Sequence, residues 1–273
     1  MRCIFCKKDS SNSKSVEHII PQSLGNTEHV LPPGVVCDVC NNYLATKVEK
    51  PFLDSLFMRY KRFEMKVPSK KGRIPPIDAW HAQTKAKVNL SFDRDQNGIS
   101  VGAAEGENES KWIYSVMNDS SGTLYIPTGE LPDSNVITRF IGKIGLEALT
   151  ARVLTVDGWE IDIVDKPELN ELRDHVRLGF PSTMWPMNYR RIYPAEKAFA
   201  ESYESYQVLH EYDILATEWD EYFIVVAIFG DEYSLNLGGR CIEGYERWLI
   251  ENDGKSPLYC GKNAQQPSAG DVG

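Results

Sequence analysis

The chain has 273 residues, of which 42% are hydrophobic and 25% charged, a composition typical of soluble globular proteins with a sizeable core. No apolar run reaches the roughly 18 to 20 residues that span a bilayer, and no apolar signal segment opens the chain, so we expect a cytoplasmic protein with no membrane partner. The net charge of −9 is uneven, because residues 1–75 carry 13 Lys and Arg against 7 Asp and Glu while the rest is acidic. This asymmetry suggests two units with different partners, of which the basic one suits nucleic acid.

The first 60 residues predict two short strands followed by a helix. A strand over residues 15–20 is stopped by Pro21, and Val35-Val36 suggests a second strand after a loop rich in Gly and Pro. Apolar residues then recur at near-helical spacing from Asn41 onwards. Pro51 fits the first turn of a second helix better than the interior of one long helix.

Residues 61–76 are basic and contain several Pro and Gly, which suits either a solvated connector or an arm that lies on phosphates. The sequence therefore predicts an N-terminal domain over residues 1–60, this linker or arm, an acidic α+β domain over 77–262 and a disordered tail over 263–273.

The acidic domain is predicted to contain an antiparallel sheet, because short strand-like runs alternate with turn signals. These runs are residues 87–92, 99–102, 112–116, 124–126, 206–217, 222–230 and 233–237. Helices are predicted over residues 135–154 with Ser134 as the cap, over 167–178 with Pro near the first turn, and over 243–250.

Four of the six cysteines form two close pairs, Cys3/Cys6 and Cys37/Cys40. In a cytosolic chain this Cys-x-x-Cys spacing is typical of metal binding and not of disulfides. Four thiolates complete a tetrahedral zinc sphere, so the zinc would be structural and its binding would help to fold a small domain. Cys241 and Cys260 are expected to be ordinary, partly buried thiols.

Between the two pairs the sequence places Glu17-His18, and Asn41 follows the last cysteine directly. A structural zinc site needs none of these residues. Phosphodiester hydrolysis does, because a neutral imidazole can take a proton from water while carboxylate and amide oxygens hold a Mg²⁺-class cation on the phosphate.

These elements together resemble the zinc-stapled form of the HNH (ββα-metal) endonuclease family. The resemblance covers residues 1 to about 60 and rests on Cys3-x-x-Cys6, Glu17-His18-Ile-Ile-Pro-Gln-Ser-Leu-Gly and Cys37-x-x-Cys40-Asn41-Asn42. It implies a small ββα-metal domain in which His18 is the general base and Glu17 and Asn41 bind catalytic Mg²⁺ or Mn²⁺. Asn42 or Glu49 is a further candidate ligand, with a helix-surface role as the alternative.

The resemblance also implies a DNA endonuclease that leaves 5′ phosphates. One such site cuts one strand, so a double-strand break would need a homodimer, a larger assembly or two sequential nicks. Contacts to the nucleic-acid backbone are expected from the basic residues of the arm and of the helix before it, namely Arg59, Lys61, Arg62, Lys70, Lys71 and Arg73.

One feature departs from the family pattern. We call each Cys-x-x-Cys pair a knuckle. In the family, an Asn several residues before the second knuckle orders the loop. This chain has Leu31-Pro32-Pro33-Gly34 at that place. An inactive, zinc-stabilised nucleic-acid-binding or assembly protein is therefore the alternative, and RNA is an alternative substrate. The acidic domain suits a regulatory, dimerising or target-sensing role, and family analogy suggests restriction or phage defence. His29 lies in the loop near the Glu-His pair and is expected to be exposed, with a phosphate contact as the alternative. His81, His175 and His210 share no motif, so surface or core positions are expected for them.

Overall fold

The computed structural model describes residues 1–69, 71–93, 98–104, 122–156, 162–180, 184–193, 198–200 and 205–264. Within them every strand pair is antiparallel, and helices accompany the sheets, so the predicted α+β class is confirmed. No helix in these ranges is long and apolar enough to cross a membrane. The chain divides into two compact units, one formed by Met1–Phe52 with Pro132–Gly273 and the other by Leu53–Leu131.

This division differs from the predicted one, which separated residues 1–60 from an acidic domain over 77–262. The N-terminal segment and most of the acidic part share one unit, while residues 53–131 form the other. Hydrophobic periodicity identifies elements but does not say which of them pack together, and this explains the difference. Of the predicted tail, residues 263 and 264 end a helix, and residues 265–273 lie outside the described part of the chain.

The N-terminal segment contains the predicted order of strand, strand and helix. Strand β1 (Glu17–His18) pairs with β2 (Val30–Leu31). The second strand was expected at Val35-Val36, but the carbonyl of Val35 instead accepts the amide of Ile4 at 3.0 Å, so this stretch supports the first knuckle. Between the strands lies the 3-10 turn η1 (Gln22–Leu24).

A nearly continuous helical stretch begins within Cys37-x-x-Cys40. Pro51 lies in the first turn of its last helix, as predicted. The stretch consists of α1 (Asp38–Leu44), the wider π-type turn η2 (Ala45–Glu49) and α2 (Lys50–Leu53).

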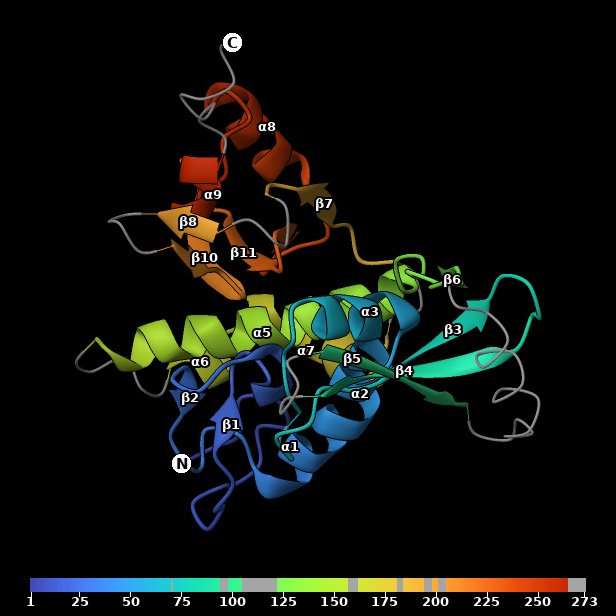
Figure 1. Cartoon of the computed structure of the whole chain (residues 1–273). Helices are drawn as coiled ribbons and strands as arrows, with labels where there is room; N and C mark the ends of the chain where they lie inside the picture. Colours follow the sequence, from blue (N-terminus) through green and yellow to red (C-terminus); the bar gives the residue numbers. More distant parts are fainter. Residues whose placement is uncertain are drawn as a thin grey trace. The chain divides into compact units, whose positions relative to one another are not determined.

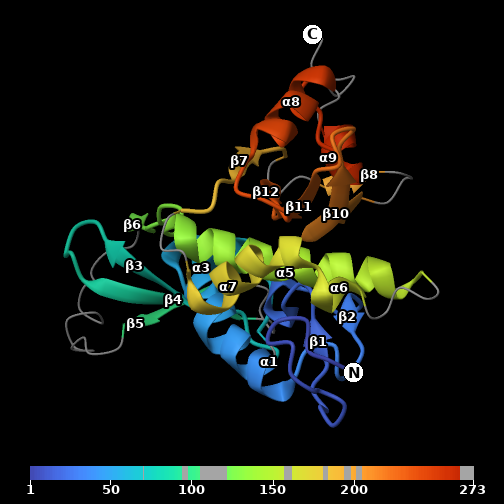
Figure 2. The same cartoon turned by 180° about the vertical axis from the view of Figure 1, so that it is seen from behind.

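The long helix α5 (Ser134–Leu154) is the centre of its unit, and its predicted bounds are confirmed to within one residue. The predicted cap is wrong, because the side chain of Asp133, and not Ser134, accepts the amide of Asn135 at 2.8 Å. Residues 137–148 of α5 are buried with one exception, because the N-terminal segment covers one side of the helix and a four-stranded sheet the other (Figures 1 and 2). Phe140 stacks on Phe52 at 4.3 Å between ring centroids and so joins α5 to the N-terminal segment.

The sheet on the far side of α5 has the strand order β10-β11-β12-β7. The strands of this part of the unit are β7 (Asn188–Arg191), β8 (Ala198–Ala200), β9 (Ser205–Gln207), β10 (His210–Ala216), β11 (Tyr222–Ile228) and β12 (Asp231–Asn236). The helices are α6 (Asp162–Asp165), η3 (Pro167–Leu169), α7 (Asn170–Leu178), α8 (Glu243–Glu251) and α9 (Tyr259–Ala264). Strands β10 to β12 and helices α7 and α8 confirm the predictions, whereas β7, β8, α6 and α9 were not predicted.

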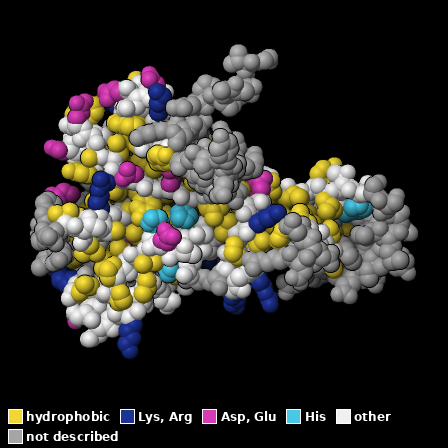
Figure 3. All heavy atoms as spheres, turned by 60° about the vertical axis from the view of Figure 1, so that its left-hand side comes forward, with side chains coloured by type: hydrophobic (Ala, Val, Ile, Leu, Met, Phe, Trp, Pro, Cys, Tyr) yellow, Lys and Arg dark blue, Asp and Glu magenta, His cyan; other side chains and the backbone are white. Residues whose placement is uncertain are grey.

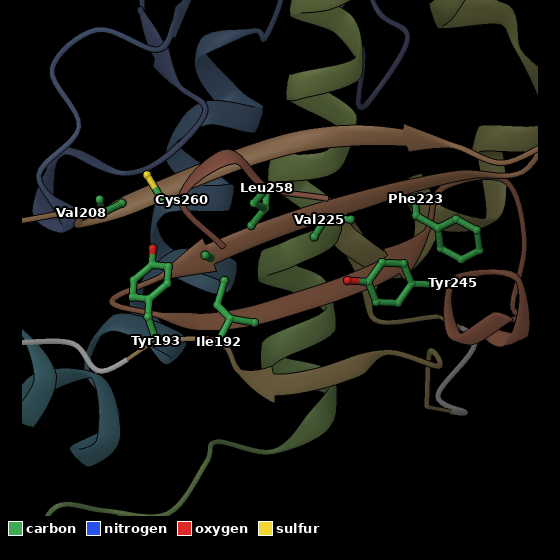
Figure 4. Packing of buried hydrophobic residues seen from close by; sticks show 9 residues of the cluster. Ile192, Tyr193, Val208, Phe223, Val225, Tyr245, Leu258 and Cys260 are labelled. Carbon is green, nitrogen blue, oxygen red and sulfur yellow. The ribbon is translucent and has the colours of Figure 1, made fainter. Parts of the chain in front are cut away.

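Strand β11 is buried on both faces, which explains its nearly continuous apolar sequence. One face, with Phe223 and Val225, packs against the C-terminal helices in a core that includes Tyr245 and Leu258 (Figure 4). Residues of the opposite face, such as Ile224, meet α5 at Gly145, where a Cβ atom would lie 2.9 Å from the Ile224 side chain. A glycine is therefore required for the close approach of helix and sheet.

In the described part of the unit formed by Leu53–Leu131, a small sheet is accompanied by helix α3. Its elements are α3 (Leu56–Glu64), β3 (Ile77–His81), β4 (Lys87–Asp93), β5 (Gly98–Ala103) and β6 (Leu124–Tyr125), with the sheet order β5-β4-β3-β6. Its core consists of Phe63, Ile74, Ile77, Ala79, Val88 and Leu90. The predicted strands β4, β5 and β6 are confirmed, whereas the predicted strand over 112–116 lies outside the described residues. Helix α3 takes up the first residues of the predicted linker.

His175 of α7 is a fully buried, neutral histidine. Its Nε2 lies 2.9 Å from the hydroxyl oxygen of Thr138, and that hydroxyl donates its own hydrogen to the carbonyl of Ser134. Nε2 must therefore be the donor, which leaves Nδ1 unprotonated and without a partner. Burial, together with the charges of Arg139 and Arg240, lowers the pKa of His175 to about 4.

We expect His175 to make the protein acid-labile. Its folded-state pKa lies below the unfolded value of about 6.5, so the unfolded chain takes up the proton first, and the contribution to stability is complete above pH 6.5 and lost as the pH falls toward 4. Between pH 7 and 4.5 the loss is about 2 to 3 kcal/mol in the free energy of unfolding. Urea unfolding of the wild type and of His175→Gln at both pH values measures it, with the exposed His29→Gln as control. Equal pH dependence of the wild type and His175→Gln would contradict the assignment.

Candidate metal centre and adjoining site

The four predicted zinc ligands come together. The Sγ atoms of Cys3, Cys6, Cys37 and Cys40 all lie within 4.8 Å of one another, and Cys6 and Cys37 are 3.7 Å apart. Zn–S bonds of about 2.3 Å in a tetrahedron require sulfur atoms about 3.8 Å apart, so the group fits a zinc ion. It is the only group of three or more Cys, His, Asp or Glu with this geometry among the described residues.

Local structure aims the thiols inward. Cys37 is the N-cap of α1, and its sulfur accepts the amide of Cys40 at 3.4 Å. In the first knuckle Lys7 has a φ of 60°, and its amide bonds to the carbonyl of Cys3 at 2.9 Å, which closes a tight turn. A hydrogen bond from the thiol of Cys40 lowers the pKa of Cys3 to about 4, whereas burial raises the pKa of Cys37 and the hydrogen bond with Cys3 raises that of Cys40. Four thiolates at this spacing would therefore need a divalent cation to offset their mutual repulsion.

The Glu-His pair lies on β1. The side chain of Glu17 is 7% exposed, whereas His18 is only partly buried. Because neighbouring residues of a strand point to opposite faces, the carboxylate turns toward the interior and the imidazole away from it. This arrangement leaves the imidazole in reach of solvent, as a base that activates water requires.

Asn26 orders the loop between β1 and β2, a role that the sequence prediction left unfilled. Its Nδ2 donates to the carbonyls of Ile20 and His29 at 2.6 and 3.0 Å. Its Oδ1 accepts the amides of Glu28 and His29 at 3.0 and 2.9 Å. Asn26 is 2% exposed, so these four bonds satisfy a buried amide completely and fix both ends of the loop. The family's middle Asn is absent at Leu31-Pro32-Pro33-Gly34, as the sequence indicated, and the loop is ordered by Asn26, which lies earlier in the chain.

Asn41 and Asn42 lie in the first turns of α1 and differ in exposure. Asn41 is partly buried and shares a helix face with the buried Leu44, three residues further on, whereas Asn42 is exposed. Asn41 therefore points more toward the protein interior than Asn42 does.

Lys143 of α5 reaches the Glu-His pair, a contact that the sequence prediction missed. Its Nζ lies 2.7 Å from Oε1 of Glu17, and it donates to the main-chain carbonyl of His18 at 2.9 Å. Burial raises the pKa of Glu17, and the ammonium of Lys143 opposes this shift. More than a hundred residues separate the partners, and no sequence motif marks Lys143.

The basic residues expected to bind nucleic acid belong to the unit formed by Leu53–Leu131. Lys71 and Arg73 are exposed, while Arg59 donates to the carbonyl of Pro76 at 2.9 Å and Lys61 lies over the ring of Phe57. Arg62 differs from the expectation, because it is 5% exposed and has no surface to offer to a phosphate. Lys70 lies outside the described residues.

Histidine side chains gather on one face of the molecule (Figure 3). The ring of the exposed His29 lies 6.1 Å from that of His210 and 5.2 Å from that of Tyr212, edge to face in both cases. His29 and His210 therefore join the loop after β1 to strand β10. His81 and His175 are buried, as expected for core histidines.

Comparison with known proteins assigns the N-terminal segment. Residues 3–57 match the family model of HNH endonucleases. No curated protein and no solved structure matches the chain. The chain thus carries an N-terminal HNH domain with a four-cysteine cluster, and the predicted resemblance is confirmed for this segment, which is less than a quarter of the sequence.

We expect the purified protein to contain one zinc ion per chain and to depend on it for its fold. Cys37→Ser with Cys40→Ser should abolish zinc binding and lower the melting temperature by 10 °C or more, because binding energy of about 10 kcal/mol or more stabilises such sites. Elemental analysis and thermal unfolding measure the two effects, with Cys241→Ser as control. Full stability without zinc would contradict the assignment.

We expect Asn26→Ala to cost about 2 to 3 kcal/mol in the free energy of unfolding, because it leaves buried carbonyls and amides of the loop without partners. Asn26→Asp should cost a similar amount, since a carboxylate cannot donate to the carbonyls of Ile20 and His29. Denaturant unfolding measures both changes. The exposed Asn42→Ala should change stability by less than about 0.5 kcal/mol. An Asn26→Ala variant as stable as this control would contradict the loop-ordering role.

Proposed function

We propose that the protein is a metal-dependent endonuclease that hydrolyses phosphodiester bonds of DNA. The main support for this proposal is the HNH domain over residues 3–57, which carries the motif His18 on β1 and also contains the four-cysteine cluster. The ordered β1–β2 loop supports it, because Asn26 keeps the strand that bears His18 in one conformation.

In the proposed mechanism the imidazole of His18 accepts a proton from the attacking water. The carboxylate of Glu17 and the amide oxygen of Asn41 would hold a Mg²⁺-class ion, because such ions usually bind proteins through only one or two groups and keep several waters. When bound, such an ion neutralises charge on the scissile phosphate and stabilises the leaving 3′ oxygen. His18 suits proton transfer near neutral pH because the ordinary pKa of histidine is about 6.5.

Substrate contacts come from exposed lysines and arginines such as Lys71 and Arg73, which bind backbone phosphates without reading sequence. One site cuts one strand, so double-strand cleavage proceeds by dimerisation or by two nicks. A role in restriction or phage defence is a proposal by analogy with HNH proteins that carry an appended domain.

A second candidate is an inactive, zinc-stabilised nucleic-acid-binding or assembly protein. The observation that favours it is the ion pair of Glu17 with Lys143, because an ammonium already contacts the carboxylate that would bind the cation. Cleavage assays separate the two candidates.

We expect the wild type to cleave plasmid DNA with Mg²⁺ or Mn²⁺ and His18→Ala to cleave at least about 10²-fold more slowly, the usual cost of losing a general base. Zinc content and melting temperature should not change. His29→Ala removes an exposed histidine of the neighbouring loop and should keep the rate within about threefold. If the wild type and His18→Ala are equally inactive with every metal while zinc stays bound, the enzyme proposal fails. Competition between labelled DNA and RNA identifies the substrate.

A further inference from the structure

Lys143 is a charged residue in the middle of an apolar helix face. Around it on α5 the buried side chains include Ile137, Phe140, Ile141 and Ile144, and the side chain of Lys143 itself has no exposed surface. Its ammonium contacts four oxygen atoms. These are Oε1 of Glu17 at 2.7 Å, Oε1 of Glu49 at 2.7 Å, Oε2 of Glu147 at 3.0 Å and the carbonyl of His18 at 2.9 Å.

This cluster is costly for a purely structural element. Taking charges out of water carries a penalty that their mutual attraction often does not recover, and apolar residues of similar size frequently give equal or greater stability. Three carboxylates surround one ammonium, and Oε1 of the fully buried Glu147 has no hydrogen-bond partner. Stability alone therefore does not account for a lysine at this position.

The contacts of Lys143 converge on the proposed nuclease centre. Two of them hold the neighbouring residues of β1, one through the side chain of Glu17 and one through the main chain of His18. A third holds Glu49, at the end of the turn that follows α1. Strand β1 has only two residues and pairs with a strand of two, so its own ladder gives it little rigidity. One atom of α5 thus links the strand and the helical segment that bear the proposed catalytic groups.

We propose that Lys143 is a positioning residue of the nuclease centre, which fixes the Glu17 carboxylate and the His18 main chain from helix α5. This inference rests on the proposed function. It makes α5 part of the catalytic unit, so the HNH segment is not an independent module joined to a separate regulator. A bond to one carboxylate oxygen sets the direction in which Glu17 faces, and the bond to the His18 carbonyl limits movement of the base.

The test compares full-length variants that remove the ammonium together with one of its acidic partners. Lys143→Met with Glu147→Leu removes one ammonium and one carboxylate from the same helix and fills the space with apolar groups. Arg173→Lys is the matched control, because Arg173 is also a buried cation, 2% exposed, that holds the N-terminal segment through the carbonyl of Ile4 at 2.8 Å but contacts neither Glu17 nor His18. Zinc content and circular dichroism confirm the fold of each variant.

We expect the folded double variant to lose about 10²-fold in kcat on duplex DNA with KM within twofold of the wild type, because misplacement of catalytic groups by about 1 Å costs this much. Arg173→Lys should keep kcat within threefold. A folded, zinc-loaded double variant with wild-type kcat would overturn the positioning role and leave the nuclease proposal intact. No cleavage by the wild type would overturn both.

If the double variant does not fold, Lys143→Arg replaces it in the same assay. A guanidinium keeps the charge but distributes its donors over a planar fork, which cannot contact all four oxygens from one point. The same loss of kcat at constant KM is expected, and an unchanged kcat would overturn the proposal.

Discussion

The structure around β1 depends on a single buried ammonium. Lys143 lies within hydrogen-bond distance of three carboxyl groups and donates to a main-chain carbonyl, and these contacts tie two N-terminal elements to helix α5, which begins at Ser134. Removing such a charge leaves its partners buried and uncompensated, which is far more costly than the interaction is stabilising. The four-cysteine cluster, by contrast, lies within the N-terminal segment, in the two Cys-x-x-Cys turns and at the start of α1. Two groups therefore hold the N-terminal segment in place: its own four-cysteine cluster and Lys143 of α5.

Local sequence signals predicted much of this fold. The two Cys-x-x-Cys pairs predicted the four-cysteine cluster, because four thiols at that spacing can complete a tetrahedral coordination sphere. Helix α5 was predicted almost to the residue, since its apolar stripe is long, and β11 was predicted because it is buried on both faces. Short elements at the ends of loops, such as β7 and α9, were missed. A few residues of strand or helix carry too little periodicity to stand out, and the pairing of β7 with β12 is a long-range contact.

The site was less predictable than the fold. Family motifs predicted its residues, and their catalytic roles remain proposals. Asn26 was overlooked because its role depends on where four loop groups lie in space and not on its distance from a cysteine. Lys143 belongs to no motif. A single lysine in an apolar helix stripe gives no indication of a functional role in the sequence, because its partners are distant in the chain. The division into units was missed for the same reason, because packing partners distant in sequence decide it.

Hydrogen exchange of the zinc-loaded, full-length protein tests most directly whether Lys143 joins the N-terminal segment to α5. Peptides that cover residues 15–24 and 134–154 are followed by mass spectrometry in the wild type and in the Lys143→Met, Glu147→Leu variant. If Lys143 holds the segment in place, residues 15–24 exchange at least about tenfold faster in the variant, while peptides from β10 and β11 keep their wild-type protection. Wild-type exchange of residues 15–24 in the variant would contradict it, because the segment would then be held in place without the ammonium.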